Sequence, residues 1–189
     1  MNDYYIVIMA GGRGERFWPE SRQRRPKHLL PIVGDRPMLR QTLDRLDPAI
    51  PSDHVFIITN REQREEVCRV CPDLPDENIV AEPVGRDTAP AVGLALALVR
   101  SRNPEAVFAM LPADHVIQDA KGFRECLRNA YEIAKSADLL VTIGIEPDKP
   151  ATGYGYIHRV APLEGFENVG AYRVRRFVEK PDLGKAREY

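Results

Sequence analysis

The sequence has few of the residues that build disulfides, metal clusters or membrane spans. Only three of its 189 residues are cysteines, and the C-x-x-C pair of Cys68 and Cys71 has no second pair to complete a zinc site. We interpret it as two cysteines one helical turn apart in a reducing compartment. No apolar run approaches the roughly 20 residues of a membrane-spanning helix. The chain starts without the basic region and cleavage site of a signal peptide, so we expect a cytoplasmic protein with no membrane partner.

Excess charge of either sign is also absent. Lysine and arginine number 27 against 28 aspartates and glutamates, which gives a net charge of −1. Domains that bind nucleic acid usually carry a basic excess, so we expect no nucleic-acid partner. The four histidines suggest no Ser-His-Asp arrangement; they are His28, His54, His115 and His158.

Short apolar runs alternate with segments of helical period, which predicts an α/β fold. The predicted strands are residues 4–9, 55–59, 79–81, 107–111 and 139–144, and the predicted helices are residues 38–46, 61–70, 88–102 and 122–136. Strands that are apolar throughout indicate a Rossmann-like, mostly parallel twisted sheet with helices on both faces. Residues 152–160 and 172–180 alternate in polarity, and we expect them to form a mixed-sheet extension near the C-terminus.

The last residues after Pro181 are typical of the first turns of a helix, with Asp182 as its N-cap. A helix that stops after two turns is unusual at a natural terminus. We therefore expect residues 1–189 to be one domain that is truncated at its C-terminal end.

The most informative stretch is AGGRGERFWPESRQRRPKHLLPIVG, residues 10–34, which directly follows the first apolar run. It joins a glycine-rich turn to six cations, Arg13, Arg16, Arg22, Arg24, Arg25 and Lys27. Glycines allow a backbone to approach a phosphate, and fixed cations neutralise it. The turn is not a P-loop, because no Gly-Lys-Ser/Thr follows, and Phe17 replaces the last glycine of G-x-G-x-x-G. In a nearly neutral chain, this pattern predicts a small anionic ligand.

Two further motifs begin where predicted strands end, which is where parallel sheets bind ligands. EPVGRDTAPA (82–91) follows the third strand, and LPADH (111–115) closes the fourth. We expect both motifs to meet the glycine turn at one edge of the sheet.

The run GGRGERFWPESR…PKH resembles the signature of the sugar-nucleotide pyrophosphorylases, and specifically of the mannose-1-phosphate guanylyltransferases. GGxGxR with a later PK is widespread among nucleotidyltransferases, whereas the aromatic-Trp-Pro-x-Ser-Arg insert is narrower. EPVGRDTAPA, LPADH, TGYGYI and FVEKP (177–181) follow in the family's order, so the resemblance covers essentially the whole chain. It implies a nucleotidyltransferase domain for GDP-mannose biosynthesis.

The implied reaction condenses mannose 1-phosphate with GTP to give GDP-mannose and pyrophosphate, by in-line attack on the α-phosphate. The nucleophile is a phosphate oxygen that is already ionised at neutral pH, so the reaction needs no general base. Catalysis then consists of positioning two polyanions and stabilising the developing charge.

The resemblance implies roles for the residues of the glycine turn and its continuation. Gly11, Gly12 and Gly14 would wrap the nucleotide phosphates, and Arg13 and Arg16 would bind the departing β- and γ-phosphates. Lys27 would bridge the α-phosphate and the incoming sugar phosphate; the plainer alternative for Lys27 is a solvated lysine after a proline.

Glu82 and Thr88 would meet the guanine and its ribose, and Thr88 is also a suitable N-cap for the apolar helix that follows. Asp114 would bind Mg²⁺ or another divalent cation, which prefers one or two carboxylates together with substrate phosphates. The alternative for Asp114 is a helix cap.

In the second half of the chain, Gly153 and its neighbour Gly155 would pass close to the sugar, unless they only shape a hairpin. Glu179 would accept hydrogen bonds from sugar hydroxyls, and Lys180 would hold the sugar phosphate. Otherwise these two residues form an exposed charge pair of little energetic value.

Two alternatives stay open on the sequence alone. One is another guanylyltransferase, such as that of molybdenum cofactor synthesis, and the other is a non-catalytic module that senses a nucleotide sugar. Because the family's enzymes are longer, we expect this chain to bind GTP better than it turns GTP over. A homo-oligomer also stays open.

Overall fold

The computed structural model describes residues 3–12, 17–22 and 25–189. The chain divides into two compact units, Met1–Tyr131 and Glu132–Tyr189. The first unit contains a four-stranded sheet, and the second contains a two-stranded sheet and a terminal helix.

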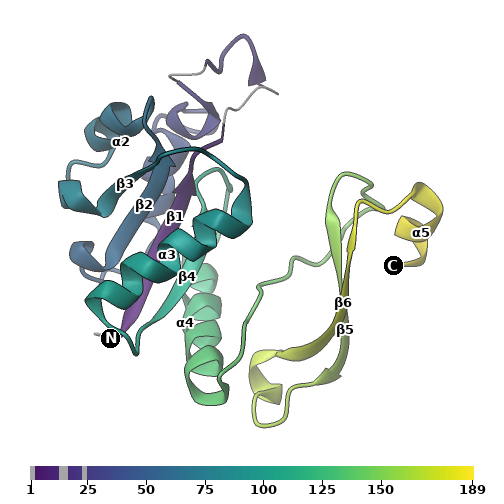
Figure 1. The fold of residues 1–189 in the computed structure, drawn as a ribbon. Helices are drawn as coiled ribbons and strands as arrows, with labels where there is room; N and C mark the ends of the chain where they lie inside the picture. Colours follow the sequence, from purple (N-terminus) through teal and green to yellow (C-terminus); the bar gives the residue numbers. More distant parts are fainter. Residues whose placement is uncertain (1–2, 13–16, 23–24) are drawn as a thin grey trace. The chain divides into compact units, whose positions relative to one another are not determined.

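The four-stranded sheet is parallel throughout, as the apolar runs predict (Figure 1). Its spatial order is β3-β2-β1-β4, and the strands span Tyr4–Ala10 (β1), Val55–Asn60 (β2), Ile79–Glu82 (β3) and Val107–Pro112 (β4). Ala10 pairs with Thr59, and Met9 pairs with Pro112. The carboxyl ends of β1, β2 and β4 therefore lie side by side at one edge.

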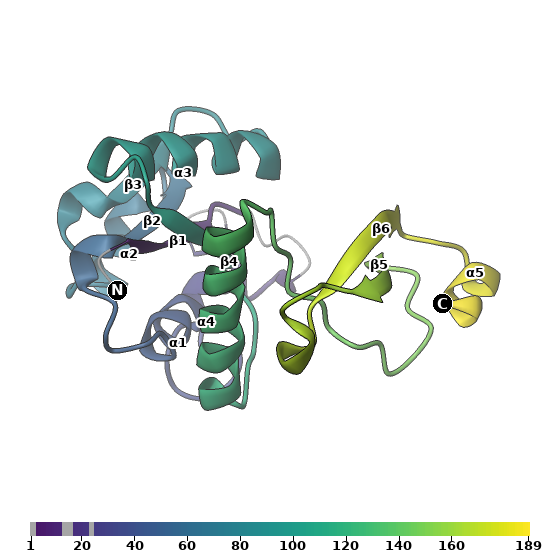
Figure 2. The same cartoon turned by 90° about the horizontal axis from the view of Figure 1, so that it is seen from below.

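Helices cover both faces of this sheet, which confirms the Rossmann-like prediction. The helices are α1 (Met38–Asp44), α2 (Arg64–Val70), α3 (Thr88–Arg102) and α4 (Ala120–Ala137). Short 3-10 helices occupy Lys27–Leu29, Ser52–His54, Asp76–Asn78 and Glu167–Val169. Figure 2 shows α3 on one side of the sheet and α1 and α4 on the other.

The alternation of side chains along β1 produces the two halves of the core. Ile6 and Ile8 pack in one cluster with side chains of α1, α2 and α4. Tyr5 and Val7 point to the opposite face and pack in a second cluster with α3. Because both faces of β1 are covered, the middle of its apolar run, Tyr5–Ile8, is buried.

Cys68 on α2 and Cys71, which caps the end of this helix, are free cysteines, as interpreted from the sequence. Cys71 is 1% exposed, and burial raises the pKa of its thiol to about 12. Cys68 donates its thiol hydrogen to Asp76 Oδ1 at 3.4 Å, and both cysteines are free thiols. Among the described residues, no helix is long and apolar enough to cross a lipid bilayer.

The second unit is built on an antiparallel pair, β5 (Gly155–Pro162) and β6 (Tyr172–Glu179). These strands form a sheet of their own. The terminal helix α5 (Leu183–Glu188) begins where the sequence predicts it, because Asp182 Oδ1 accepts a hydrogen bond from the Lys185 amide at 2.9 Å.

The predicted strand at residues 139–144 is wrong, because this segment has no regular secondary structure. Leu140 is fully exposed, and Ile145 is 84% exposed. A strand forms through backbone pairing and side-chain burial, and neither is available to this apolar run. The run has the composition of a strand without a neighbouring strand to pair with.

Leu39 on α1 and Leu96 on α3 offer a matched test of the core. Leu39 is 0% exposed and Leu96 is 52% exposed. We expect Leu39→Ala to lower the free energy of unfolding by about 2–5 kcal/mol, because it leaves a cavity. Leu96→Ala should change it by less than about 0.5 kcal/mol. Urea unfolding followed by circular dichroism measures both, and equal losses would contradict the described core.

Candidate functional site

The described part of the glycine turn begins where β1 ends. Three side chains from the end of β2 and the turn after it approach its carbonyl oxygens. Thr59 Oγ1 donates to Ala10 O at 2.8 Å, Asn60 Nδ2 to Gly11 O at 3.5 Å, and Gln63 Nε2 to Gly12 O at 3.4 Å. Sequence reasoning missed all three donors. Arg13, Gly14 and Arg16 lie outside the described residues.

Glu82 lies next to this turn, as expected for a residue at the end of β3. A Cβ atom at Gly11 would lie 3.5 Å from Glu82 Oε2, so the carboxylate and the glycine backbone are close neighbours. Burial raises the pKa of the Glu82 carboxyl. The structure therefore brings together Gly11 of the glycine turn and Glu82 at the end of β3.

Lys27 and Asp114 meet from positions 87 residues apart. Lys27 Nζ lies 3.2 Å from Asp114 Oδ2, and the side chains are 26% and 42% exposed. The same ammonium lies 4.8 Å from the centre of the Phe17 ring. A half-exposed ion pair contributes at most about 1 kcal/mol to stability. Lys27 is therefore not the solvated lysine of the alternative interpretation, and both groups stay accessible to a ligand.

Helix α1 holds the loop that carries Asp114. Arg45 Nη2 donates to His115 O at 2.8 Å, and Thr42 Oγ1 lies 3.5 Å from Ala113 O. Arg45 is 7% exposed, has no ion-pair partner among the described residues, and burial lowers its pKa. The sequence did not reveal this support, because helical periodicity marks only the apolar face of α1.

His28 is buried beside the ion pair. It is 4% exposed, and its Nε2 atom has no hydrogen-bond partner among the described residues. Burial lowers the pKa of His28 to about 4, although the negative charge of Asp114 acts in the opposite direction. His28 is therefore neutral at physiological pH, and no role for it was expected from the sequence.

The Asp114 carboxylate could supply part of the ligand shell of a magnesium ion. Asp114 supplies one accessible carboxylate, and the described part of the chain contains no group of three or more His, Cys, Asp or Glu side chains that could hold a metal alone. Magnesium commonly takes one or two carboxylates and completes its shell with phosphate oxygens and water. Asp114 suits a metal that arrives with the substrate's phosphates.

The prediction that Thr88 caps α3 is wrong. Thr88 is the first residue of the helix, and Asp87 occupies the cap position with a φ of 62° and no side-chain capping bond. The local backbone places Thr88 one residue too late to act as the N-cap. Residues 83–90 are exposed, so a ligand can reach Thr88.

In the second unit, Glu179 and Lys180 pair with each other. Lys180 Nζ lies 3.2 Å from Glu179 Oε1, and the lysine and glutamate side chains are 64% and 73% exposed. The Lys180 amide donates to Tyr154 O at 3.2 Å. A Cβ atom at Gly155 would lie 2.9 Å from Glu179 Oε2, whereas nothing described lies within 4 Å of such an atom at Gly153. A side chain at Gly155 would therefore displace the end of the exposed Glu179 side chain, whereas one at Gly153 would meet no described atom.

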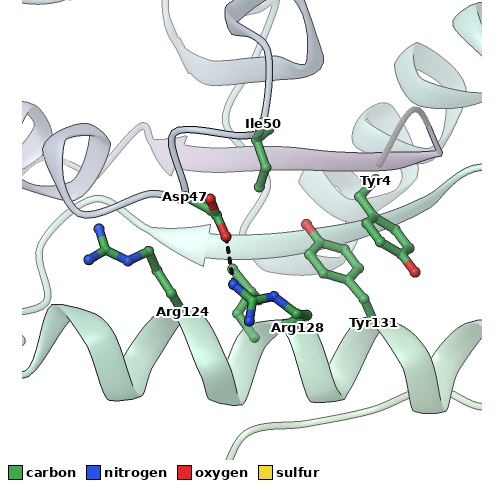
Figure 3. A pocket seen from close by; sticks show the side chains of 7 residues that line it. Tyr4, Asp47, Ile50, Arg124, Arg128 and Tyr131 are labelled. Carbon is green, nitrogen blue, oxygen red and sulfur yellow. Dashed lines mark hydrogen bonds and ion pairs between the residues drawn. The ribbon is translucent and has the colours of Figure 1, made fainter.

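A separate hollow lies near the amino end of β1, and Figure 3 shows its lining. Arg128 forms an ion pair with Asp47 across it at 2.9 Å. The rings of Tyr4 and Tyr131 stack with centroids 4.5 Å apart, and the Tyr131 hydroxyl donates to Tyr5 O at 2.6 Å. These side chains satisfy one another and fasten α4 to the sheet, so the hollow is packing rather than a ligand site.

Comparison with known proteins places these features in context. The family model described as nucleotidyl transferase matches residues 5–189. The chain is 43% identical to the mannose-1-phosphate guanylyltransferase of Escherichia coli K12 and 42% identical to the mannose-1-phosphate guanylyltransferase ManC of Salmonella typhimurium LT2. Each match covers 98% of this chain, and the chain spans only 39% of each relative.

A solved structure agrees with this result. The crystal structure of a mannose-1-phosphate geranyltransferase from Thermus thermophilus superposes with a TM-score of 0.85 at 41% identity. The match covers 99% of this chain and 53% of that one. The fold described above is therefore shared along the whole length of this chain.

Burial of His28 makes a prediction about pH. Its pKa is about 4 in the folded chain and about 6.5 when unfolded, so the unfolded chain takes up a proton first as the pH falls. The folded state should lose stability between about pH 6.5 and pH 4, by up to about 3 kcal/mol. Urea unfolding of the wild type and His28→Gln across this range isolates the contribution. Identical pH profiles for the two proteins would show that His28 is not responsible.

Proposed function

Because the chain belongs to the nucleotidyl transferase family, we propose that it transfers a guanylyl group from GTP to mannose 1-phosphate. One observation carries the proposal: Lys27 and Asp114 meet at 3.2 Å just beyond the carboxyl ends of the parallel strands, where such sheets bind ligands. The identity of 40–43% to mannose-1-phosphate guanylyltransferases favours this choice of substrates.

The reaction forms one bond and breaks one at the α-phosphorus. An ionised phosphate oxygen of mannose 1-phosphate attacks, and the bond from the α-phosphorus to the bridging β-oxygen breaks, so pyrophosphate leaves with the electron pair. No proton has to be removed from the nucleophile. The protein therefore needs cations and amides that hold charged groups in line, and Lys27 and the backbone of Gly11 and Gly12 would supply them.

Lys27 and Asp114 divide the electrostatic work in this proposal. Lys27 exchanges its carboxylate partner for phosphate oxygens, where it holds the α-phosphate and the incoming sugar phosphate. Asp114 would hold Mg²⁺, which neutralises charge on the phosphates when it is bound. Gly11 and Gly12 offer backbone amides to the nucleotide, and Arg13, Gly14 and Arg16 remain predicted phosphate ligands.

The remaining roles concern recognition. Glu82 and Thr88 would select the base and ribose, and Glu82 lies next to the glycine turn. In the second unit, Glu179 would accept hydrogen bonds from sugar hydroxyls, Lys180 would bind the sugar phosphate, and the backbone at Gly153 would face the sugar. The exposure of Glu179 and Lys180 leaves both charges available.

A pyrophosphate-release assay tests the function. We expect release from GTP, in preference to the other three nucleoside triphosphates, only with mannose 1-phosphate and Mg²⁺ present. Asp114→Asn and Lys27→Met should each lower the rate by about 10²–10³-fold, because each removes charge that stabilises the transition state.

The ion pair of Asp47 and Arg128 supplies the matched control, because it lies in the hollow near the amino end of β1. Asp47→Asn should leave the rate within about twofold of the wild type. Release that needs no mannose 1-phosphate would refute the proposed acceptor. Tight GTP binding without any release would favour the sensing module instead, provided that a longer form of the protein is also inert.

The Lys27–Asp114 ion pair also predicts how the nucleotide-free chain binds metal. Lys27 competes with a cation for the Asp114 carboxylate. We expect Lys27→Met to tighten Mn²⁺ binding by about 2–5-fold, the equivalent of an exposed ion pair, and Asp114→Asn to abolish it. Electron paramagnetic resonance of free Mn²⁺ measures the affinity, and Arg128→Met is the charge-matched control. An unchanged affinity in Lys27→Met would show that the two residues do not compete.

A further inference from the structure

We infer that Thr59, Asn60 and Gln63 are positioning residues that set the conformation of the glycine turn for phosphate binding. The inference rests on the proposed function, since it assigns the turn to the triphosphate. It adds three side chains from the end of β2 and the turn that follows, none of which would itself touch the substrate.

The three donors act on three consecutive carbonyl oxygens. Thr59 reaches Ala10 O at 2.8 Å, Asn60 reaches Gly11 O at 3.5 Å, and Gln63 reaches Gly12 O at 3.4 Å. Thr59 and Gln63 are both 0% exposed, so their polar groups depend on protein partners. The end of β2 and the turn that follows it thus contribute three donors to the last residue of β1 and the first two residues of the glycine turn.

Asn60 is itself held in the orientation that this role requires. Its Oδ1 atom accepts a hydrogen bond from the backbone N–H of Gln63 at 2.9 Å. An asparagine amide has one acceptor oxygen and one donor nitrogen, so the nitrogen is left to face Gly11 O. The same contact ties Asn60 to Gln63, and the donors therefore act as one connected group.

A hydrogen bond that fixes a backbone carbonyl group also fixes the direction of the N–H group in the same peptide unit. In a planar trans peptide, the C=O and the following N–H point in opposite directions. With Gly11 O turned toward Asn60, the Gly12 N–H points away from Asn60.

Side-chain packing does not fix the backbone conformation at Gly12. Among the described residues, nothing lies within 4 Å of a Cβ atom placed on Gly12. Glycine has more backbone freedom than any other residue, so an unsupported glycine turn would sample many amide directions. The hydrogen bonds from Asn60 and Gln63 are what restrict it.

Asn78 provides a matched control near the amino end of β2. It is 1% exposed, and its Nδ2 atom donates to Asp53 O at 2.9 Å and to Val55 O at 3.0 Å. Gln63→Met and Asn78→Leu each replace a buried amide by an apolar side chain of similar size. Both should destabilise the fold, and only the first should affect the glycine turn.

The experiment titrates the 189-residue chain with GTP, tripolyphosphate and guanosine by calorimetry, at a temperature where circular dichroism shows each variant folded. Gln63→Met should weaken GTP and tripolyphosphate binding by about tenfold, since one lost hydrogen bond is worth about that factor. Guanosine binding should stay within about twofold, as should all three affinities in Asn78→Leu.

Thr59 keeps the test decisive if Gln63→Met does not fold. Thr59→Val removes the donor to Ala10 O and should weaken tripolyphosphate binding, whereas Thr59→Ser retains the hydroxyl and should restore it. Equal affinities in wild type, Gln63→Met and Thr59→Val overturn this inference while leaving the proposed function standing. A wild-type chain that binds neither GTP nor tripolyphosphate overturns both.

Discussion

The parallel register of β1 between β2 and β4 is the constraint on which the site depends. Because the three strands run in one direction, the segments that follow them emerge at the same edge of the sheet. The register is held by burial on both faces, with Ile6 and Ile8 on one side and Tyr5 and Val7 on the other. A slip by one residue would exchange these faces and separate Gly11 from its donors.

Charge at this edge is arranged in two ways that serve different purposes. The Lys27–Asp114 pair is half-exposed, so each member can change partner without leaving a buried charge unpaired. Arg45 is buried, and its hydrogen-bond partner among the described residues is a backbone carbonyl. We therefore expect Arg45 to keep its position when a polyanion binds. Asp114, one of the two exchangeable charges, thus lies on a loop that the buried charge of Arg45 supports.

The sequence predicted the four parallel strands to within about a residue, because each apolar run is bounded by turn residues. The contact of Gly11 with Glu82 and that of Lys27 with Asp114 are consistent with the strand order and the family motifs. Thr88 and residues 139–144 show the limit, since capping and pairing depend on backbone geometry that composition does not encode. Thr59, Asn60 and Gln63 were missed because donors to backbone carbonyls leave no periodic signal.

Glycines in the two units differ in which of their features matters, the backbone groups in the first unit and the absent side chain in the second. At Gly11 and Gly12 the backbone itself would be the functional surface of the proposed site, and hydrogen bonds from Asn60 and Gln63 hold its carbonyl oxygens. At Gly155 the absence of a side chain leaves room for the Glu179 carboxylate, because a Cβ atom there would lie 2.9 Å from Glu179 Oε2 and displace it. A phosphate is recognised by amides and a sugar hydroxyl by a carboxylate. Under the proposed function, the first use of glycine would suit a triphosphate, and the second would leave room for the Glu179 carboxylate beside a sugar.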